Sequence, residues 1–196
     1  MKKLSMIASV LALSFSSNVF AETDAPVSWD YAEVGYKKVK LDGLTLDGYV
    51  VDVTKSITNN MFVFTSFSRA QDDVNVGLAS TLDVELDQFN LGVGYRNAIT
   101  ETTDFFATLS FETADVSIAD ESVDDDGFGA EIGVRSMLTD NLEIGGNFGL
   151  LSLGDEQDYV IGVAANYQIT EQFSATLGFE YMDDVKQYEA SVRYSF

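Results

Sequence analysis

The sequence predicts an all-β fold: a closed, up-and-down antiparallel barrel of ten strands, with eight strands as the alternative. The main observation is strict two-residue alternation of apolar and polar side chains over segments of eight or more residues, which indicates strands and not helices. In addition, short and more variable connections alternate along the chain, as they do between the two ends of such a barrel. Finally, the 196 residues are 46% hydrophobic, so the apolar side chains need strand faces to occupy.

The first 21 residues have the pattern of a secretory signal peptide, which leaves residues 22–196 as the barrel domain. Lys2 and Lys3 give a basic start, an apolar stretch follows, and small residues precede a cleavage site after Ala21. A retained membrane anchor is the alternative, but the apolar stretch is short and wrongly flanked for a spanning helix. No run of about 18 apolar residues follows it.

Charge and missing residue types disfavour several classes of function. After cleavage, nine basic residues stand against 32 acidic ones, so nucleic acid is not expected as a partner, because its binding needs a basic surface. The chain has no cysteine and no histidine. Disulfides, Ser-His-Asp and Cys-His catalysis and the usual zinc sites are therefore unavailable. A carboxylate-only enzyme remains open, but we expect no enzyme, metal or cofactor.

The alternating segments predict ten strands, in order, near residues 29–40, 45–56, 61–69, 84–96, 104–113, 127–137, 142–152, 158–168, 173–182 and 187–196. Tyr49, Val51 and Val53 mark the second strand. The clearest later patterns are DQFNLGVGYR, FFATLSFE, GFGAEIGVR, DYVIGVAANYQ, FSATLGFEY and QYEASVRYSF. The third segment, MFVFTSFSR, is apolar on both faces at its start and gives no face assignment.

The connections between these strands are of two kinds. Short, turn-like connections are expected at 56–60, 97–104, 138–141 and 169–172. More variable connections are expected at 41–45, 70–83, 114–126, 153–157 and 182–187, two of them long. Because the two kinds alternate, the short turns gather at one end of the barrel and the variable loops at the other.

Three features favour a transmembrane barrel over a soluble one. Aromatic residues flank the apolar faces, as at membrane interfaces: Tyr36, Tyr49, Tyr95, Phe105, Phe128, Tyr159, Tyr167, Phe173, Tyr181, Tyr188 and Tyr194. The polar faces are rich in glycine and small residues, and strands of about nine to eleven residues match a tilted bilayer crossing. Lipid offers no partner for a free strand edge, so the first strand is expected to pair with the last. Both termini and the short turns are then expected in the periplasm.

The chain resembles the small outer-membrane β-barrel proteins of Gram-negative bacteria, the porin-family or OmpA-like barrel domains. The matching segments are the signal peptide, YAEVGYKK, DQFNLGVGYR, DGFGAEIGVRS and VRYSF. The resemblance implies an outer-membrane location after export. It is weak for activity, because the group includes structural proteins, adhesins, narrow pores and a few enzymes. The proteases, deacylases and acyltransferases among such barrels use histidine, which this chain lacks.

The polar face predicts a charge network inside the barrel. Its members are Glu33, Lys37, Arg96, Glu112, Glu131, Arg135, Glu180, Glu189 and Arg193, with Asp52 and Glu143 beside them. Ion pairs that fill the lumen are the favoured interpretation, because an unpaired buried charge costs several kcal/mol. A narrow channel that passes small cationic solutes is the alternative.

The variable connections are strongly acidic, with fourteen acidic residues against one basic residue, Lys186. Solvation of the surface is the favoured interpretation, and binding of divalent cations that bridge to lipopolysaccharide is the alternative. The segment DESVDDDGFGAE does not fit a calcium loop, since Ser122 and Gly133 stand where the end ligands belong.

The expected function is that of a non-enzymatic outer-membrane barrel with a structural or surface-interaction role. Expected partners are outer-membrane lipid, lipopolysaccharide, periplasmic chaperones and the barrel assembly machinery. The last strand, with Tyr188, Val192, Tyr194 and Phe196 facing lipid, resembles the signal by which that machinery recognises its clients.

Overall fold

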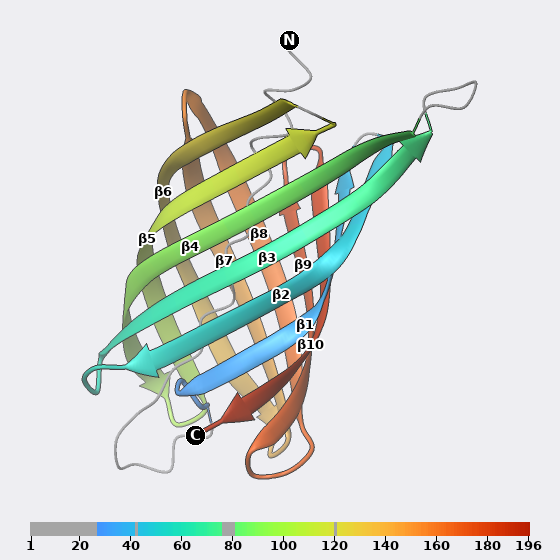
Figure 1. Cartoon of the computed structure of the whole chain (residues 1–196). Coiled ribbons are helices and arrows are strands. Elements are labelled where there is room, and N and C mark those ends of the chain that lie inside the picture. The colour runs from blue at the N-terminus through green and yellow to red at the C-terminus, as the bar shows by residue number, and fades with distance from the viewer. Residues whose placement is uncertain (1–26, 42, 76–80, 120) are drawn as a thin grey trace.

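The computed structural model describes residues 27–41, 43–75, 81–119 and 121–196, which form one closed antiparallel barrel (Figure 1). Its strands are β1 (Tyr31–Leu41), β2 (Leu44–Ser56), β3 (Met61–Asn75), β4 (Thr81–Thr100), β5 (Thr103–Ile118), β6 (Glu121–Thr139), β7 (Leu142–Leu153), β8 (Glu156–Gln168), β9 (Phe173–Met182) and β10 (Val185–Ser195). Each strand pairs with its sequence neighbours, and β1 closes onto β10. The predicted barrel of ten strands is confirmed. The predicted signal peptide lies outside the described residues.

The two ends of the barrel differ in their connections. The turn end carries the turns 57–60, 101–102, 140–141 and 169–172 together with the C-terminus, at the bottom of Figure 1. The loop end carries the other five connections. Among the described residues, no helix is long and apolar enough to cross a membrane.

A threonine closes the turn in three of the four hairpins at the turn end. The hydroxyls of Thr58, Thr139 and Thr170 each accept hydrogen bonds from the backbone N–H groups two and three residues further along. Threonine favours such local bonds to the backbone over continued strand pairing. The repeated Ile/Leu-Thr pattern in the sequence therefore has a common structural cause.

The predicted long loops at 70–83 and 114–126 are wrong, because most of their residues extend strands. β3 and β4 pair from Met61 with Tyr95 as far as Asn75 with Thr81. β5 and β6 pair as far as Ile118 with Glu121. Figure 1 shows β3 to β6 as the long strands of one wall of the barrel.

These strands were mistaken for loops because their apolar residues change face along the strand. Phe89 and Leu91 of β4 point outward and are exposed, whereas Val84 and Leu86 nearer the loop end point inward and are buried. In β5 the change falls between outward Phe111 and inward Ala114. Where lipid surrounds the barrel, its outer face is apolar. Where water surrounds it, the apolar side chains are buried inside. The switch therefore marks where the wall rises above the bilayer.

Outward-facing apolar side chains form an apolar belt around the barrel below this switch. Its most exposed members include Val34, Leu91, Leu109, Phe128, Ile132, Tyr159, Ile161, Val163, Leu177 and Val192. Such a continuous exposed apolar surface is what lipid covers in a membrane barrel.

Candidate functional site

The barrel interior is the candidate functional site, and it divides into three layers along the axis. An aromatic plug lies at the turn end, an acidic layer lies in the middle, and an apolar layer lies at the loop end. The plug consists of Val27, Trp29, Phe62, Phe64 and Phe106, with Met137 packed against them. Each layer is built by side chains that alternate inward along the strands.

Trp29 is the centre of the aromatic plug. The sequence predicted that the first strand begins at this residue, but β1 begins at Tyr31, and Trp29 is fully buried inside the barrel. Its ring centroid lies 4.8 Å from that of Phe62 and 5.6 Å from that of Phe106. Its indole N–H donates to Asp104 Oδ2 at 2.9 Å. The segment before β1 thus closes the turn end from within.

Two ion pairs surround the plug and anchor its position. Arg193 and Glu33 are direct cross-strand partners, and Arg193 Nε lies 2.8 Å from Glu33 Oε2. Arg135 pairs with Glu143, and its Nη1 donates to the Ser28 backbone carbonyl at 3.3 Å. The guanidinium carbon of Arg135 also lies 4.8 Å from the centroid of the Trp29 ring. These contacts hold the charges paired and tie them to the plug.

Glycines on the facing strands make room for the plug. A Cβ atom on Gly94 would lie 2.0 Å from Cζ of Phe62, and one on Gly133 would lie 2.4 Å from Cζ of Phe106. The glycine-rich inner face expected from the sequence is therefore where the aromatic rings of the plug fit.

The acidic layer contains more carboxylates than cations. Its members are Lys37 and the five acids Asp52, Glu112, Glu131, Glu180 and Glu189, which interact electrostatically. Lys37 Nζ donates to Gln88 Oε1 at 2.8 Å and to Ser68 Oγ at 3.0 Å. One oxygen each of Glu112, Glu131 and Glu180 has no hydrogen-bond partner within the described protein. A single ammonium group thus faces five carboxyl groups.

The loop end of the lumen is apolar. Two buried clusters line it: Val39, Leu46, Ala70, Val84, Leu86, Val116 and Val185, and beside them Ala114, Leu151, Leu153, Val160 and Met182. Several of these side chains, including those of Leu46, Leu86 and Val160, have no exposed surface at all. The burial of these side chains leaves no surface for water beside them, which favours a lumen that is closed at this end.

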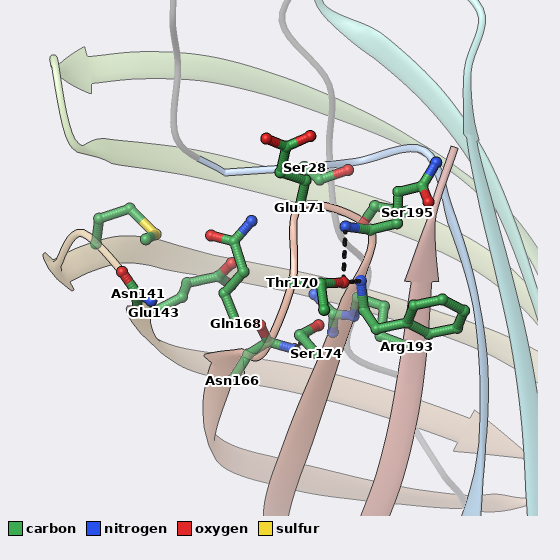
Figure 2. A pocket seen from close by; sticks show the side chains of 13 residues that line it. Ser28, Asn141, Glu143, Asn166, Gln168, Thr170, Glu171, Ser174, Arg193 and Ser195 are labelled. Atoms are coloured by element: carbon green, nitrogen blue, oxygen red, sulfur yellow. Dashed lines mark hydrogen bonds between the residues drawn. The ribbon is translucent and has the colours of Figure 1, made fainter.

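The interior cavities that the described residues line are small. A polar cavity of about 60 Å³ opens at the turn end among Asn141, Glu143, Asn166, Ser174 and Arg193 (Figure 2). A second cavity, of about 10 Å³, lies deeper, beside Phe106 and Arg135. A cavity needs about 10–15 Å³ of such volume to hold one water molecule. The larger cavity therefore has room for several water molecules.

The structure places all nine residues of the predicted lumen network inside the barrel. They do not form one ladder: Glu33, Arg96, Arg135 and Arg193 surround the plug, whereas Lys37, Glu112, Glu131, Glu180 and Glu189 belong to the acidic layer. Asp104, which accepts from Trp29, was not predicted as a lumen residue because it lay at the boundary between a predicted turn and a predicted strand. The apolar layer was also missed, and the change of face along β4 and β5 was the signal for it.

Four acidic residues at the loop end, Asp83, Asp115, Asp124 and Asp126, are exposed on the outer faces of extended strands. Asp42 and Asp120 lie outside the described residues. Across the parts of the chain that the structure describes, no three acidic side chains are grouped so as to hold a metal ion.

The predicted assembly residues lie on the outer face of the closing strand. Tyr188, Val192, Tyr194 and Phe196 are all exposed there. The Phe196 backbone N–H donates to the Asp30 carbonyl at 3.1 Å. The chain terminus is thereby joined to the segment that precedes β1.

Comparisons with known proteins agree with this architecture. A family model described as outer membrane protein beta-barrel domain matches residues 7–196. No curated protein matches the chain. The NanC porin structure is similar at 8% identity and a TM-score of 0.56, covering 84% of this chain and 100% of that one. The KdgM porin in complex with disordered oligogalacturonate is similar at 9% identity and a TM-score of 0.52, covering 84% and 99%. These identities reflect a shared fold.

Proposed function

We propose that the chain, which belongs to the outer membrane protein β-barrel domain family, is a sealed, non-enzymatic barrel with a structural or surface-interaction role. The family indicates an outer-membrane location in a Gram-negative bacterium. The observation that supports the sealed barrel is the closure of the lumen at both ends. Trp29 and Phe62 are fully buried at the turn end, as are Leu46 and Val160 at the loop end.

A sealed lumen leaves the outer surfaces to carry the function. KdgM and NanC are porins by name, but a likeness of fold at this identity does not extend to transport, and the interior of this chain is filled. The absence of histidine and cysteine supports a role without catalysis. We infer export through a cleaved signal peptide, escort by periplasmic chaperones and contact with outer-membrane lipid and lipopolysaccharide.

In planar bilayers, the purified full-length barrel is expected to give no discrete conductance steps. Ions would have to cross two layers of fully buried apolar side chains, which exclude water. A known porin, inserted into the same bilayers, provides the positive control. Reproducible cation-selective steps would overturn the sealed barrel and support the narrow channel instead.

Deleting Phe196 is expected to reduce the amount of barrel in the outer membrane several-fold, with little effect on the stability of refolded protein. The side chain is 55% exposed on the outer face and fills no interior space, which supports a role in recognition by the assembly machinery. Cell fractionation and heat-modifiable gel mobility measure insertion. Phe196→Tyr, which keeps a terminal aromatic residue, serves as the control. Normal surface levels of the truncated chain would refute this role.

A further inference from the structure

Two lysines face each other across the seam of the barrel, on its outer surface. Lys40 of β1 and Lys186 of β10 are direct register partners, and both side chains are exposed. Like charges directly opposite on neighbouring strands destabilise a sheet. Among the described residues, neither ammonium group forms an ion pair with a carboxylate. This pairing of like charges is conspicuous in a chain with 32 acidic and 11 basic residues.

A third lysine on the same face is already occupied. Lys38 Nζ lies 2.7 Å from Asp47 Oδ1, and Tyr36 also donates to that carboxylate. Lys38 lies beside Lys40 and Lys186, but its ammonium group is paired with Asp47. Of the three lysines, Lys40 and Lys186 are the ones available to an external anion.

The lysine pair lies at the depth of the lipid headgroups. Lys40 Nζ lies 5.2 Å from the centroid of the Tyr188 ring, and Lys38 Nζ lies 5.8 Å from that of Tyr36. Tyrosine rings of this kind mark the membrane interface. The pair lies on the loop-end side of these rings, which is the outer leaflet if the short turns are periplasmic.

The other outward cations are satisfied within the protein. Arg69 at the loop end donates two hydrogen bonds to Asp87 and lies 3.6 Å from Glu85. Lys55 at the turn end lies 3.3 Å from Asp30. Arg69 and Lys55 are therefore surface cations whose charge is already paired with a carboxylate, and they serve as controls for Lys40 and Lys186.

We propose that Lys40 and Lys186 form a binding site for a phosphate group on the headgroup of lipopolysaccharide in the outer leaflet. Register partners lie about 5 Å apart at their Cα atoms, so two flexible ammonium groups can reach one phosphate. A phosphate between them replaces the like-charge repulsion with two charge-assisted hydrogen bonds. This site goes beyond the sealed-barrel proposal and does not depend on it.

The test uses the full-length barrel in detergent and native mass spectrometry to measure the affinity for bisphosphorylated lipid A. Lipid A stripped of its phosphates is the comparison. The double variant Lys40→Gln, Lys186→Gln is expected to bind the bisphosphorylated form roughly 10- to 30-fold more weakly, from the loss of two basic residues at an anionic surface. It is expected to bind the stripped form as the unaltered protein does.

Three controls fix the interpretation. Arg69→Gln is expected to leave the affinity unchanged, whereas Asp47→Asn is expected to raise it by releasing Lys38. Inorganic phosphate at the lipid concentration is expected not to displace lipid A, and displacement would overturn lipid as the ligand. The site would be overturned if the unaltered protein bound both lipid forms equally. It would also be overturned if the double variant, with normal heat-modifiable mobility, bound bisphosphorylated lipid A with unchanged affinity. Conductance has no bearing on these outcomes.

Discussion

Replacing Trp29 with alanine is expected to lower the free energy of unfolding by about 3–5 kcal/mol. The indole is fully buried between Phe62 and Phe106, so its removal leaves a cavity that flanking strands cannot fill. The loss also removes the hydrogen bond to Asp104 at 2.9 Å and the ring beneath Arg135. Urea unfolding of the refolded barrel, followed by circular dichroism, measures the change, since Trp29 is the only tryptophan in the chain.

Two further variants separate the contributions of the Trp29 side chain. Trp29→Phe keeps an aromatic ring in the plug but leaves Asp104 without its donor, so a smaller loss of about 1–3 kcal/mol is expected. Tyr167→Ala removes an aromatic residue near the same end from the outer face, where the ring is 55% exposed, and is expected to cost less than Trp29→Ala. Equal stability of Trp29→Ala and the unaltered barrel would contradict a structural plug.

Trp29 also illustrates what the sequence could not reveal. The alternation placed Glu33 and Lys37 on the inner face, and the structure has them there. Alternation applies only within a strand, however, and Trp29 lies before β1. Its direction is set by contacts with residues far along the chain, including Asp104, 75 positions away. No local pattern encodes such contacts.

The two long loops that the sequence predicted in place of strand extensions are wrong for a different physical reason. A membrane barrel is in contact with lipid along part of its length and with water along the rest, so the apolar face moves from outside to inside. In β4, Val84 and Leu86 are followed by Phe89 and Leu91. The apolar residues therefore recur every two residues except for one interval of three. A search for one uninterrupted period ends the strand at that gap. With one inversion of the faces allowed, the same pattern predicts the apolar layer.

Replacing Lys37 with methionine is expected to destabilise the barrel by about 3–5 kcal/mol, the cost of removing one partner from a buried charge network. The substitution keeps most of the side-chain volume and removes the one ammonium group among five acids of the acidic layer. It also removes the donor to Ser68 Oγ and one of the two donors to Gln88 Oε1, which keeps the Ser68 hydroxyl. Urea unfolding followed by the fluorescence of Trp29 measures the change.

A second substitution tests whether charge, and not packing, causes this loss. Glu180 interacts electrostatically with Lys37, and one of its oxygens lacks a partner within the described protein. Adding Glu180→Gln to Lys37→Met removes one negative charge at nearly constant volume, so the double variant is expected to recover part of the lost stability. When Lys37 is present, Glu180→Gln removes an attractive partner of the lysine as well as a repulsive charge. Glu180→Gln alone is therefore expected to change the free energy of unfolding less than it does in the Lys37→Met background. Additive effects of the two substitutions would show that Lys37 does not balance the acidic layer, because coupled charges deviate from additivity.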